Sequence, residues 1–261
     1  MIKQRLIPVL YIKNGLIVRS ENFAEHKIIG NVVNEVKRYN QWNIDELVYI
    51  DISREKVYDS RRDDHKIKRI KSIYEALRLI AKESFMPLCF GGGIRDLETI
   101  KYFLKNGADK VVVNTILHKK PDIIAKAIDI FGSQAIVASI DYRLVNGEMI
   151  FYMENGTEQI DKNLYEIAQH IQKLGCGEVF LTSIDNDGMG EGYDIESITK
   201  AVNEFSIPLV ACGGAMNVID FEAAARIDSL SGIAAGNMFH FTENIYPRSK
   251  DILKSKNLNF R

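Results

Sequence analysis

Short runs of consecutive apolar residues recur along the whole chain, and segments with helical spacing separate them. The runs are too short for helices, and they lack the strict apolar–polar alternation of a sheet with one face in water. They therefore predict parallel strands that are buried on both faces. The eight predicted strands are residues 6–10, 47–52, 87–90, 111–113, 135–140, 179–182, 208–212 and 233–235.

Between these runs, apolar residues recur every three or four positions, as on the buried side of a helix. One such pattern stops at Gly175, and another begins after Asp96, a candidate N-terminal cap, and ends at Gly107. Pro121 suits the first turn of a further helix. Eight strand–helix units predict a single (β/α)8 TIM barrel domain over residues 1–261. An open doubly wound sheet is the alternative, but even spacing without a linker favours closure.

An internal repeat supports the barrel. The similar pairs are RLIPVLYIKNG with AIVASIDYRLVNG, DELVYIDI with GEVFLTSI, and FGGGIRDLETIKYFLKNGADKVVVNT with ACGGAMNVIDFEAAARIDSLSGIAAGN. These pairs match Glu46 with Glu178 and Tyr11 with Asp141. The repeat predicts two half-barrels of four units each, so each half is expected to contribute an anchor for a symmetric ligand.

The composition is that of an ordinary globular protein, with 46% hydrophobic and 26% charged residues and a net charge of −1. This balance gives no bulk attraction to nucleic acid or membrane, and no run approaches the roughly 18 apolar residues of a membrane span. No secretory signal is recognisable at the N-terminus. The cysteines Cys89, Cys176 and Cys212 follow no metal spacing and indicate a reducing compartment. We therefore expect a cytoplasmic protein with no nucleic-acid or membrane partner.

Glycines and polar residues gather where the predicted strands end, which is the functional end of a TIM barrel. Glycine between a strand and a helix lets backbone N–H groups face an anion. Two symmetric groups favour a ligand with a phosphate at each end, although tight turns alone would also explain them. The first group is Gly93, Asn114 and Thr115, and the second is Gly213, Gly214, Gly236 and Asn237, with Asp187 and Gly188 beside it.

Asp141 ends its strand and is the leading candidate for acid–base catalysis. Partial desolvation there raises the pKa of a carboxylate towards neutrality, whereas the alternative role is to cap the next loop. Asp51 lies in the apolar run VYIDIS and could be structural or orient a catalytic group. The sequence has no cluster of metal ligands, so neither a metal nor another cofactor is expected.

Longer motifs resemble the cyclase subunit of imidazole glycerol phosphate synthase, the HisF type, from about Arg5 to the C-terminus. They are DELVYIDI, FGGGIRDLETI, GADKVVVNT, FGSQAIVASID, GCGEVFLTSIDNDGMGEGYD, ACGGA and MFHF. The resemblance implies a ligand with two phosphates and a heterodimer with a HisH-like glutaminase subunit. Ammonia from that subunit would enter at the amino ends of the strands and cross the barrel core.

The resemblance also assigns four charged residues to the entrance of this channel, and all are present: Arg5, Glu46, Lys110 and Glu178. Such charges are costly to bury unless they are paired, so a structural salt-bridge layer is the alternative interpretation. Asp109 matches a position that contacts the glutaminase.

The other end of the barrel departs from the family. Its cyclase chemistry needs two facing aspartates, of which one matches Asp141 and the other falls on Tyr11. A phenol, with an ordinary pKa of about 10, is no acid–base catalyst near neutrality without a very large shift. Segment 53–72 is longer than the family pattern and holds eight Lys/Arg against four Asp/Glu, which suits an anionic ligand, a third protein or a solvated helix start. Further replaced positions are Arg19, Cys212 and Asn237.

The chain lacks one of the two aspartates but keeps the four charged residues of the channel entrance. In this combination it resembles HisF-like proteins associated with glycosyl amidation in surface-polysaccharide pathways. There, ammonia turns the acetamido group of a nucleotide-linked sugar into an acetamidino group. This step needs activation, and the chain has no Walker-type loop, so a separate ATP-using amidotransferase would be required. The alternative is an active cyclase, a lyase of histidine biosynthesis, in which another residue replaces the aspartate. A sugar-phosphate isomerase is disfavoured because it needs paired acid–base groups and no charged ring.

Overall fold

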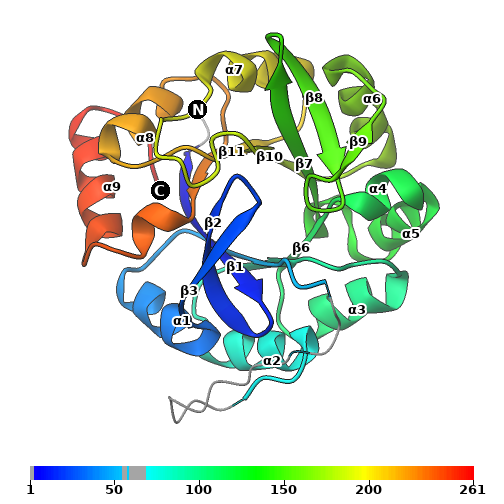
Figure 1. Ribbon diagram of the computed structural model, residues 1–261, viewed down its shortest axis with the longest axis horizontal. Coiled ribbons are helices and arrows are strands. Elements are labelled where there is room, and N and C mark those ends of the chain that lie inside the picture. Colours follow the sequence, from blue (N-terminus) through cyan, green and yellow to red (C-terminus); the bar gives the residue numbers. More distant parts are fainter. Residues whose placement is uncertain (1–2, 55–57, 59–68) are drawn as a thin grey trace.

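The computed structural model describes residues 3–54, 58 and 69–261. Eight parallel strands close into a barrel in the order β1–β4–β5–β6–β7–β10–β11–β12, with β12 pairing with β1 (Figure 1). The TIM barrel and all eight predicted strands are confirmed, and their ends shift by a few residues. The strands are β1 (Arg5–Lys13), β4 (Leu47–Asp51), β5 (Leu88–Gly91), β6 (Lys110–Val113), β7 (Ile136–Val145), β10 (Glu178–Ser183), β11 (Leu209–Cys212) and β12 (Gly232–Ala235).

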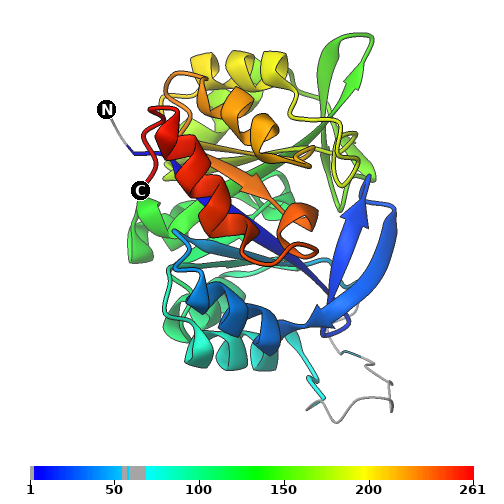
Figure 2. The ribbon, with the colours of Figure 1, turned by 90° about the vertical axis from the view of Figure 1, so that its left-hand side faces the viewer.

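Helices surround the barrel (Figures 1 and 2). The three local predictions are confirmed: the Asp96 side chain accepts from the Thr99 N–H, Pro121 begins a helix, and Gly175 is left-handed at a helix end. The helices are α1 (Val32–Gln41), α2 (Ile73–Glu83), α3 (Leu97–Lys105), α4 (Thr115–Lys119), α5 (Pro121–Phe131), α6 (Leu164–Leu174), α7 (Ile195–Glu204), α8 (Val218–Ala225) and α9 (Ile245–Ser255), with 3-10 turns η1 (Ser133–Ala135) and η2 (Asn237–Phe239).

Two antiparallel hairpins rise from the carboxyl ends of the strands, an end that we call the mouth. The first adds β2 (Leu16–Glu21) and β3 (Glu25–Asn31) to β1, and the second adds β8 (Glu148–Met153) and β9 (Glu158–Ile160) to β7. Each begins with an Asn-Gly turn in which both residues have positive φ, the geometry that joins twisted strands in two residues. The apolar runs along the sequence did not predict these hairpins.

The backbone confirms the internal repeat in detail. Tyr11 pairs with Ile50, four residues after Glu46, and Asp141 pairs with Thr182, four residues after Glu178. The glycines that follow β5 and β11 repeat too. A Cβ on Gly92 would lie 2.0 Å from the Asp51 carbonyl oxygen, and one on Gly213 would lie 2.7 Å from that of Ser183. Both positions therefore require glycine for close backbone packing.

Inward-facing side chains fill the barrel lumen with a second apolar cluster, separate from the core between sheet and helices. It consists of Ile7, Val9, Tyr11, Val18, Val48, Cys89, Val112, Val137, Phe180, Val210, Cys212 and Ala234. The lumen is thus apolar between the two ends of the barrel. Within the described residues, no helix has the length and apolar character needed to cross a membrane.

Candidate functional site

Four charged side chains meet at the amino ends of the strands and form one ion-paired ring. Arg5 donates hydrogen bonds to both Glu46 and Glu178. The Lys110 Nζ atom lies 2.9 Å from Glu46 Oε1 and 2.8 Å from Glu178 Oε2. Each cation therefore bridges both carboxylates and closes the bottom of the barrel. We call this set the charged ring; its role as an ammonia entrance stays a prediction.

Mutual compensation keeps the charged ring ionised. Burial by itself would lower the pKa of Arg5, but the carboxylates of Glu178 and Glu46 raise it above its ordinary value. Burial would raise the pKa of Glu178, but Arg5 and Lys110 hold it below the usual range. With two cations and two carboxylates, the ring meets the condition under which buried charges are tolerated.

Asp109 and Phe85 lie on the same edge of the barrel. The Asp109 carboxylate accepts a hydrogen bond of 2.8 Å from the Leu88 N–H at the start of β5. Phe85, just before β5, is 88% exposed, which is unusual for so large an apolar side chain. The structure gives Asp109 a bond within the chain, and contact with a glutaminase stays a prediction.

Asp141 points from β7 into the mouth and is buried. The Asn114 amide donates to its Oδ2 at 3.0 Å, and Ser139 Oγ lies 3.5 Å from its Oδ1. Burial raises the pKa of Asp141 to about 7, with a further contribution from the Asp187 carboxylate, while the bond from Ser139 opposes the rise. A carboxyl group with this pKa can both give and take a proton near neutrality.

Tyr11 occupies the corresponding position on β1 and is also buried. Its hydroxyl makes a hydrogen bond with the Cys212 thiol on β11. Burial, followed by the nearby Asp187 carboxylate, raises the pKa of Tyr11 well above its ordinary value. The phenol is therefore neutral at physiological pH and cannot act as the missing carboxylate.

The sequence places Asp187 beside the predicted phosphate-binding glycines, and in the structure its carboxylate also lies near the acid–base candidate Asp141. Its carboxylate is buried, and it acts electrostatically on Tyr11, Cys212 and Asp141. Burial raises the pKa of Asp187 to about 6, although the Ser20 hydroxyl and the Phe23 N–H lower it. A second carboxylate thus lies near Asp141, and an ionised carboxylate would repel a phosphate. The end of β2 lies against the loop after β10, which contains Asp187. The position of Asp187 near Asp141 therefore depends on tertiary structure.

Asp51, the other acid–base candidate, does not join this group. Side chains alternate along a strand, and in β4 it is Val48 that faces the lumen, so Asp51 faces outwards. Its carboxylate accepts from the Ser53 N–H at 2.9 Å and from the Tyr58 hydroxyl at 3.0 Å. These bonds stabilise the loop after β4, as expected if Asp51 has a structural role and not a catalytic one. Residues 55–57 and 59–68 of the basic segment 53–72 lie outside the described residues.

Two of the side chains that the sequence predicts to bind phosphate, Thr115 and Asn237, make hydrogen bonds to the hairpins, and phosphate binding by them stays a prediction. Thr115 Oγ1 accepts from the Glu154 N–H at 3.1 Å, at the turn between β8 and β9. Asn237 Nδ2 donates to the Ser20 carbonyl oxygen at 2.8 Å, on β2. The end of each half-barrel therefore fastens the hairpin of the other half.

The backbone N–H groups at the glycines are further candidates for phosphate binding. A Cβ on Gly93 would meet nothing within 4 Å, so that turn is open. Gly214 and Gly188 are packed tightly against Gly192 and Ser20 carbonyl oxygens, and Gly213 and Gly236 also lie against backbone. The two groups of glycines therefore differ in the space around them: the turn at Gly93 is open, and the glycines of the second group are packed against backbone.

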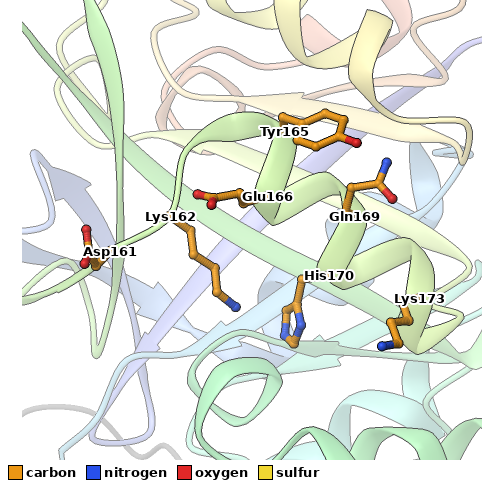
Figure 3. A pocket seen from close by; sticks show the side chains of 7 residues that line it. All are labelled: Asp161, Lys162, Tyr165, Glu166, Gln169, His170 and Lys173. Atoms are coloured by element: carbon orange, nitrogen blue, oxygen red, sulfur yellow. The ribbon is translucent and has the colours of Figure 1, made fainter.

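Two surface hollows lie outside the barrel, beside the helices α6 and α3. One follows the outer side of α6, where Lys162, His170 and Lys173 surround it (Figure 3). The other follows α3, around Tyr102 and Lys105. Both present solvated charges without convergent buried polar groups, which distinguishes them from an active site. Within the described residues, no group of three or more His, Cys, Asp or Glu side chains is arranged to hold a metal ion.

Comparison with known proteins agrees with the barrel fold. The family model described as histidine biosynthesis protein matches residues 5–244. This chain belongs to the histidine biosynthesis protein family. Its relatives include imidazole glycerol phosphate synthase subunits HisF of Sulfurisphaera tokodaii, 36% identical over 261 residues, and of Alkaliphilus metalliredigens, 35% identical over 263 residues. In both cases the whole of each chain is covered. The resemblance to HisF-type cyclase subunits is thereby confirmed.

Proposed function

We propose that this HisF-like barrel conducts ammonia from a glutaminase partner to a separate, ATP-using amidotransferase that amidinates a nucleotide-linked sugar in surface-polysaccharide synthesis. The observation that carries the proposal is the contrast between the two ends of the lumen. The charged ring is complete, whereas the mouth has Tyr11 where the repeat calls for a second aspartate.

The amino end of the barrel is suited to a docked glutaminase. The charged ring lies at the centre of this end, and Asp109 and the exposed Phe85 lie at its edge. An exposed aromatic side chain beside a polar rim is typical of an interface anchor. Ammonia is neutral and small, and the apolar lumen beyond the ring offers a route that ions would avoid.

The mouth would receive a phosphorylated or nucleotide-sugar ligand at the backbone N–H groups of the Gly93 turn, which has open space in front of it. The neutral phenol of Tyr11 leaves the acid–base work of amidination to the amidotransferase.

A second candidate function is an active cyclase, a lyase of histidine biosynthesis. One observation favours it: Asp187 supplies a second buried carboxylate near Asp141. Together the two could replace the aspartate pair that Tyr11 breaks.

Two assays test these functions. The first supplies the purified chain with the histidine-pathway intermediate and ammonium salt at high pH, and robust turnover overturns the conduit proposal. The second follows nitrogen-15 from labelled glutamine in the complex with the glutaminase and the amidotransferase, where label in the sugar amidine is expected. The substitution Lys110→Met should uncouple glutamine hydrolysis from amidination. Lys101→Met, which affects only a surface pair with Glu98, should leave the coupling intact.

A further inference from the structure

Hydrogen-bond acceptors without donors gather at the mouth. The atoms are Oδ2 of Asp187, Oδ1 of Asn114 and Oδ1 of Asn22, all buried and without a hydrogen-bond partner in the described structure. Asp187 as a whole is only 5% exposed. An unsatisfied buried acceptor costs about 1–3 kcal/mol. A ligand that donates hydrogen bonds would remove this cost.

These acceptors belong to one region, at the exit of the lumen. The Asn114 amide contacts Asp141, and the Asn22 N–H donates to the Asp187 carbonyl oxygen at 2.8 Å. The Asp187 carboxylate in turn acts on Asp141 and on the Tyr11 and Cys212 pair. We call Asp141, Asp187, Asn114 and Asn22 the acceptor cluster.

The acceptor cluster also lacks positive charge. Neither Asp141 nor Asp187 forms an ion pair with a cationic side chain in the part of the chain that the structure describes. The charged ring at the other end, by contrast, balances its two carboxylates with Arg5 and Lys110. Above the pKa values of about 7 for Asp141 and about 6 for Asp187, both carboxylates are ionised. Two buried carboxylates without a counterion then favour a ligand that brings a positive charge.

We propose that the acceptor cluster is a binding site for one ammonium ion. Ammonium carries a single positive charge, four N–H donors and no acceptor, so it complements a set of carboxylate and amide oxygens. Water would satisfy part of the acceptors but would leave the charge uncompensated. The inference rests on the proposed ammonia route, since the cluster lies where that route leaves the lumen.

A proton transfer connects this site with the route. Ammonia that leaves the lumen takes the proton of a protonated Asp141 or Asp187 carboxyl group: the O–H bond breaks, a fourth N–H bond forms, and the net charge is unchanged. The reverse step returns the proton to the carboxylate and releases neutral ammonia for attack on the acceptor. The cluster would thus retain nitrogen at the exit until a substrate arrives.

The test is a titration of the full-length chain with ammonium chloride at about pH 8, followed by the NMR shifts of the Asn114 and Gly188 backbone amides. Sodium chloride at equal ionic strength is the reference, and potassium chloride is a second one. Saturable shifts with ammonium alone are expected. The Asp187→Asn substitution should weaken the response about tenfold or more, since one charge-assisted hydrogen bond is lost. Asp141→Asn is a second variant with the same expectation.

The substitution Asp161→Asn is the matched control, because this exposed carboxylate lies on the outer face near α6 and should leave the titration unchanged (Figure 3). Equal responses to ammonium, sodium and potassium, or an unchanged response in folded Asp187→Asn and Asp141→Asn, would overturn the ammonium site. The titration uses neither glutamine nor a partner. Loss of the site therefore stays distinguishable from failure of the proposed function, which is measured by nitrogen transfer.

Discussion

The two half-barrels have matching backbones and different chemistry. Tyr11 and Asp141 occupy corresponding strand positions with corresponding partners across the sheet, yet one side chain is a neutral phenol and the other a carboxyl group that titrates near neutrality. Gly92 and Gly213 make the same close backbone approach in the two halves. Backbone packing therefore preserves the repeat, while single side chains at the mouth decide what each half can do.

The bottom of the barrel shows a second asymmetry. Both halves contribute one carboxylate to the charged ring, Glu46 and Glu178, but both cations come from the first half. The positions that correspond to Arg5 and Lys110 in the repeat are Ala135 and Gly232. The ion pairs of the ring therefore connect the two half-barrels, because Glu178 of the second half pairs with cations of the first.

Restoring the symmetry at the mouth should have the largest effect. Tyr11→Asp recreates the aspartate pair, and a positioned general acid–base contributes about 10²–10⁴-fold to rate. We expect cyclase turnover with the histidine-pathway intermediate and ammonium salt to rise from background by about this factor. Tyr11→Phe, which keeps the ring and removes the hydroxyl, should stay at background. Equal turnover in wild type and Tyr11→Asp would show that this position does not separate the two functions.

Breaking the charged ring should cause the next largest effect. Arg5→Met leaves two buried carboxylates with Lys110 alone, and removal of one partner from a buried ion pair costs about 3–5 kcal/mol. The free energy of unfolding from urea denaturation should fall by that amount. Arg226→Met, which breaks an exposed pair with Glu222, should change it by less than about 1 kcal/mol. A similar small loss in both variants would contradict a stabilising ring.

The buried carboxyl group of the second half should make stability depend on pH. Asp141 titrates near 3.8 when unfolded and at about 7 when folded. Between these values only the folded chain holds the proton, so the free energy of unfolding falls as pH rises through this window. Asp141→Asn removes the effect and should be more stable than wild type at pH above 7, by on the order of 4 kcal/mol. The gain should vanish near pH 4. A gain that is independent of pH would contradict the raised pKa, and Asp161→Asn should show neither change.

The crossed attachment of the hairpins should give the smallest effect. Thr115→Val removes a bond to the β8–β9 turn, and Asn237→Ala removes one to β2, each worth about 1 kcal/mol. Hydrogen exchange should accelerate in β8 and β9 for the first variant and in β2 and β3 for the second. Thr199→Val, whose hydroxyl bonds within its own helix, should affect neither hairpin. If exchange accelerates in the hairpin of the same half-barrel as the substituted residue, or in neither hairpin, these hydrogen bonds do not hold the hairpins as described.

Local patterns predicted most of the fold because strand and helix signals act over a few residues. The eight apolar runs, the Asp96 cap and the Gly175 stop needed no tertiary information. The hairpins were missed although each has an Asn-Gly turn, a strong local signal, between residues of strand character. Attention to that dipeptide in both repeats would have found them.

For the functional residues, the sequence predicted the charged ring but not the contacts at the mouth. Arg5, Glu46, Lys110 and Glu178 form the ring that the motifs implied. The sequence groups Asp187 with the phosphate-binding candidates because it lies where a strand ends, beside Gly188 and near the second set of glycines. Its proximity to Asp141 depends instead on where strands distant in sequence bring their ends together, and Thr115 and Asn237 likewise bind partners more than thirty residues away.

By itself, the sequence determined the barrel, its two-fold repeat, the set of charges at its base and the replacement of one aspartate by Tyr11. These features follow from residue type and short-range periodicity, which tertiary contacts modify little. Only the tertiary structure decided that Asp51 faces away from the mouth, that Asp187 lies near Asp141, and that each half-barrel fastens the other's hairpin. The physical reason is that burial and electrostatic coupling arise from distances between side chains, and closure of the barrel sets those distances.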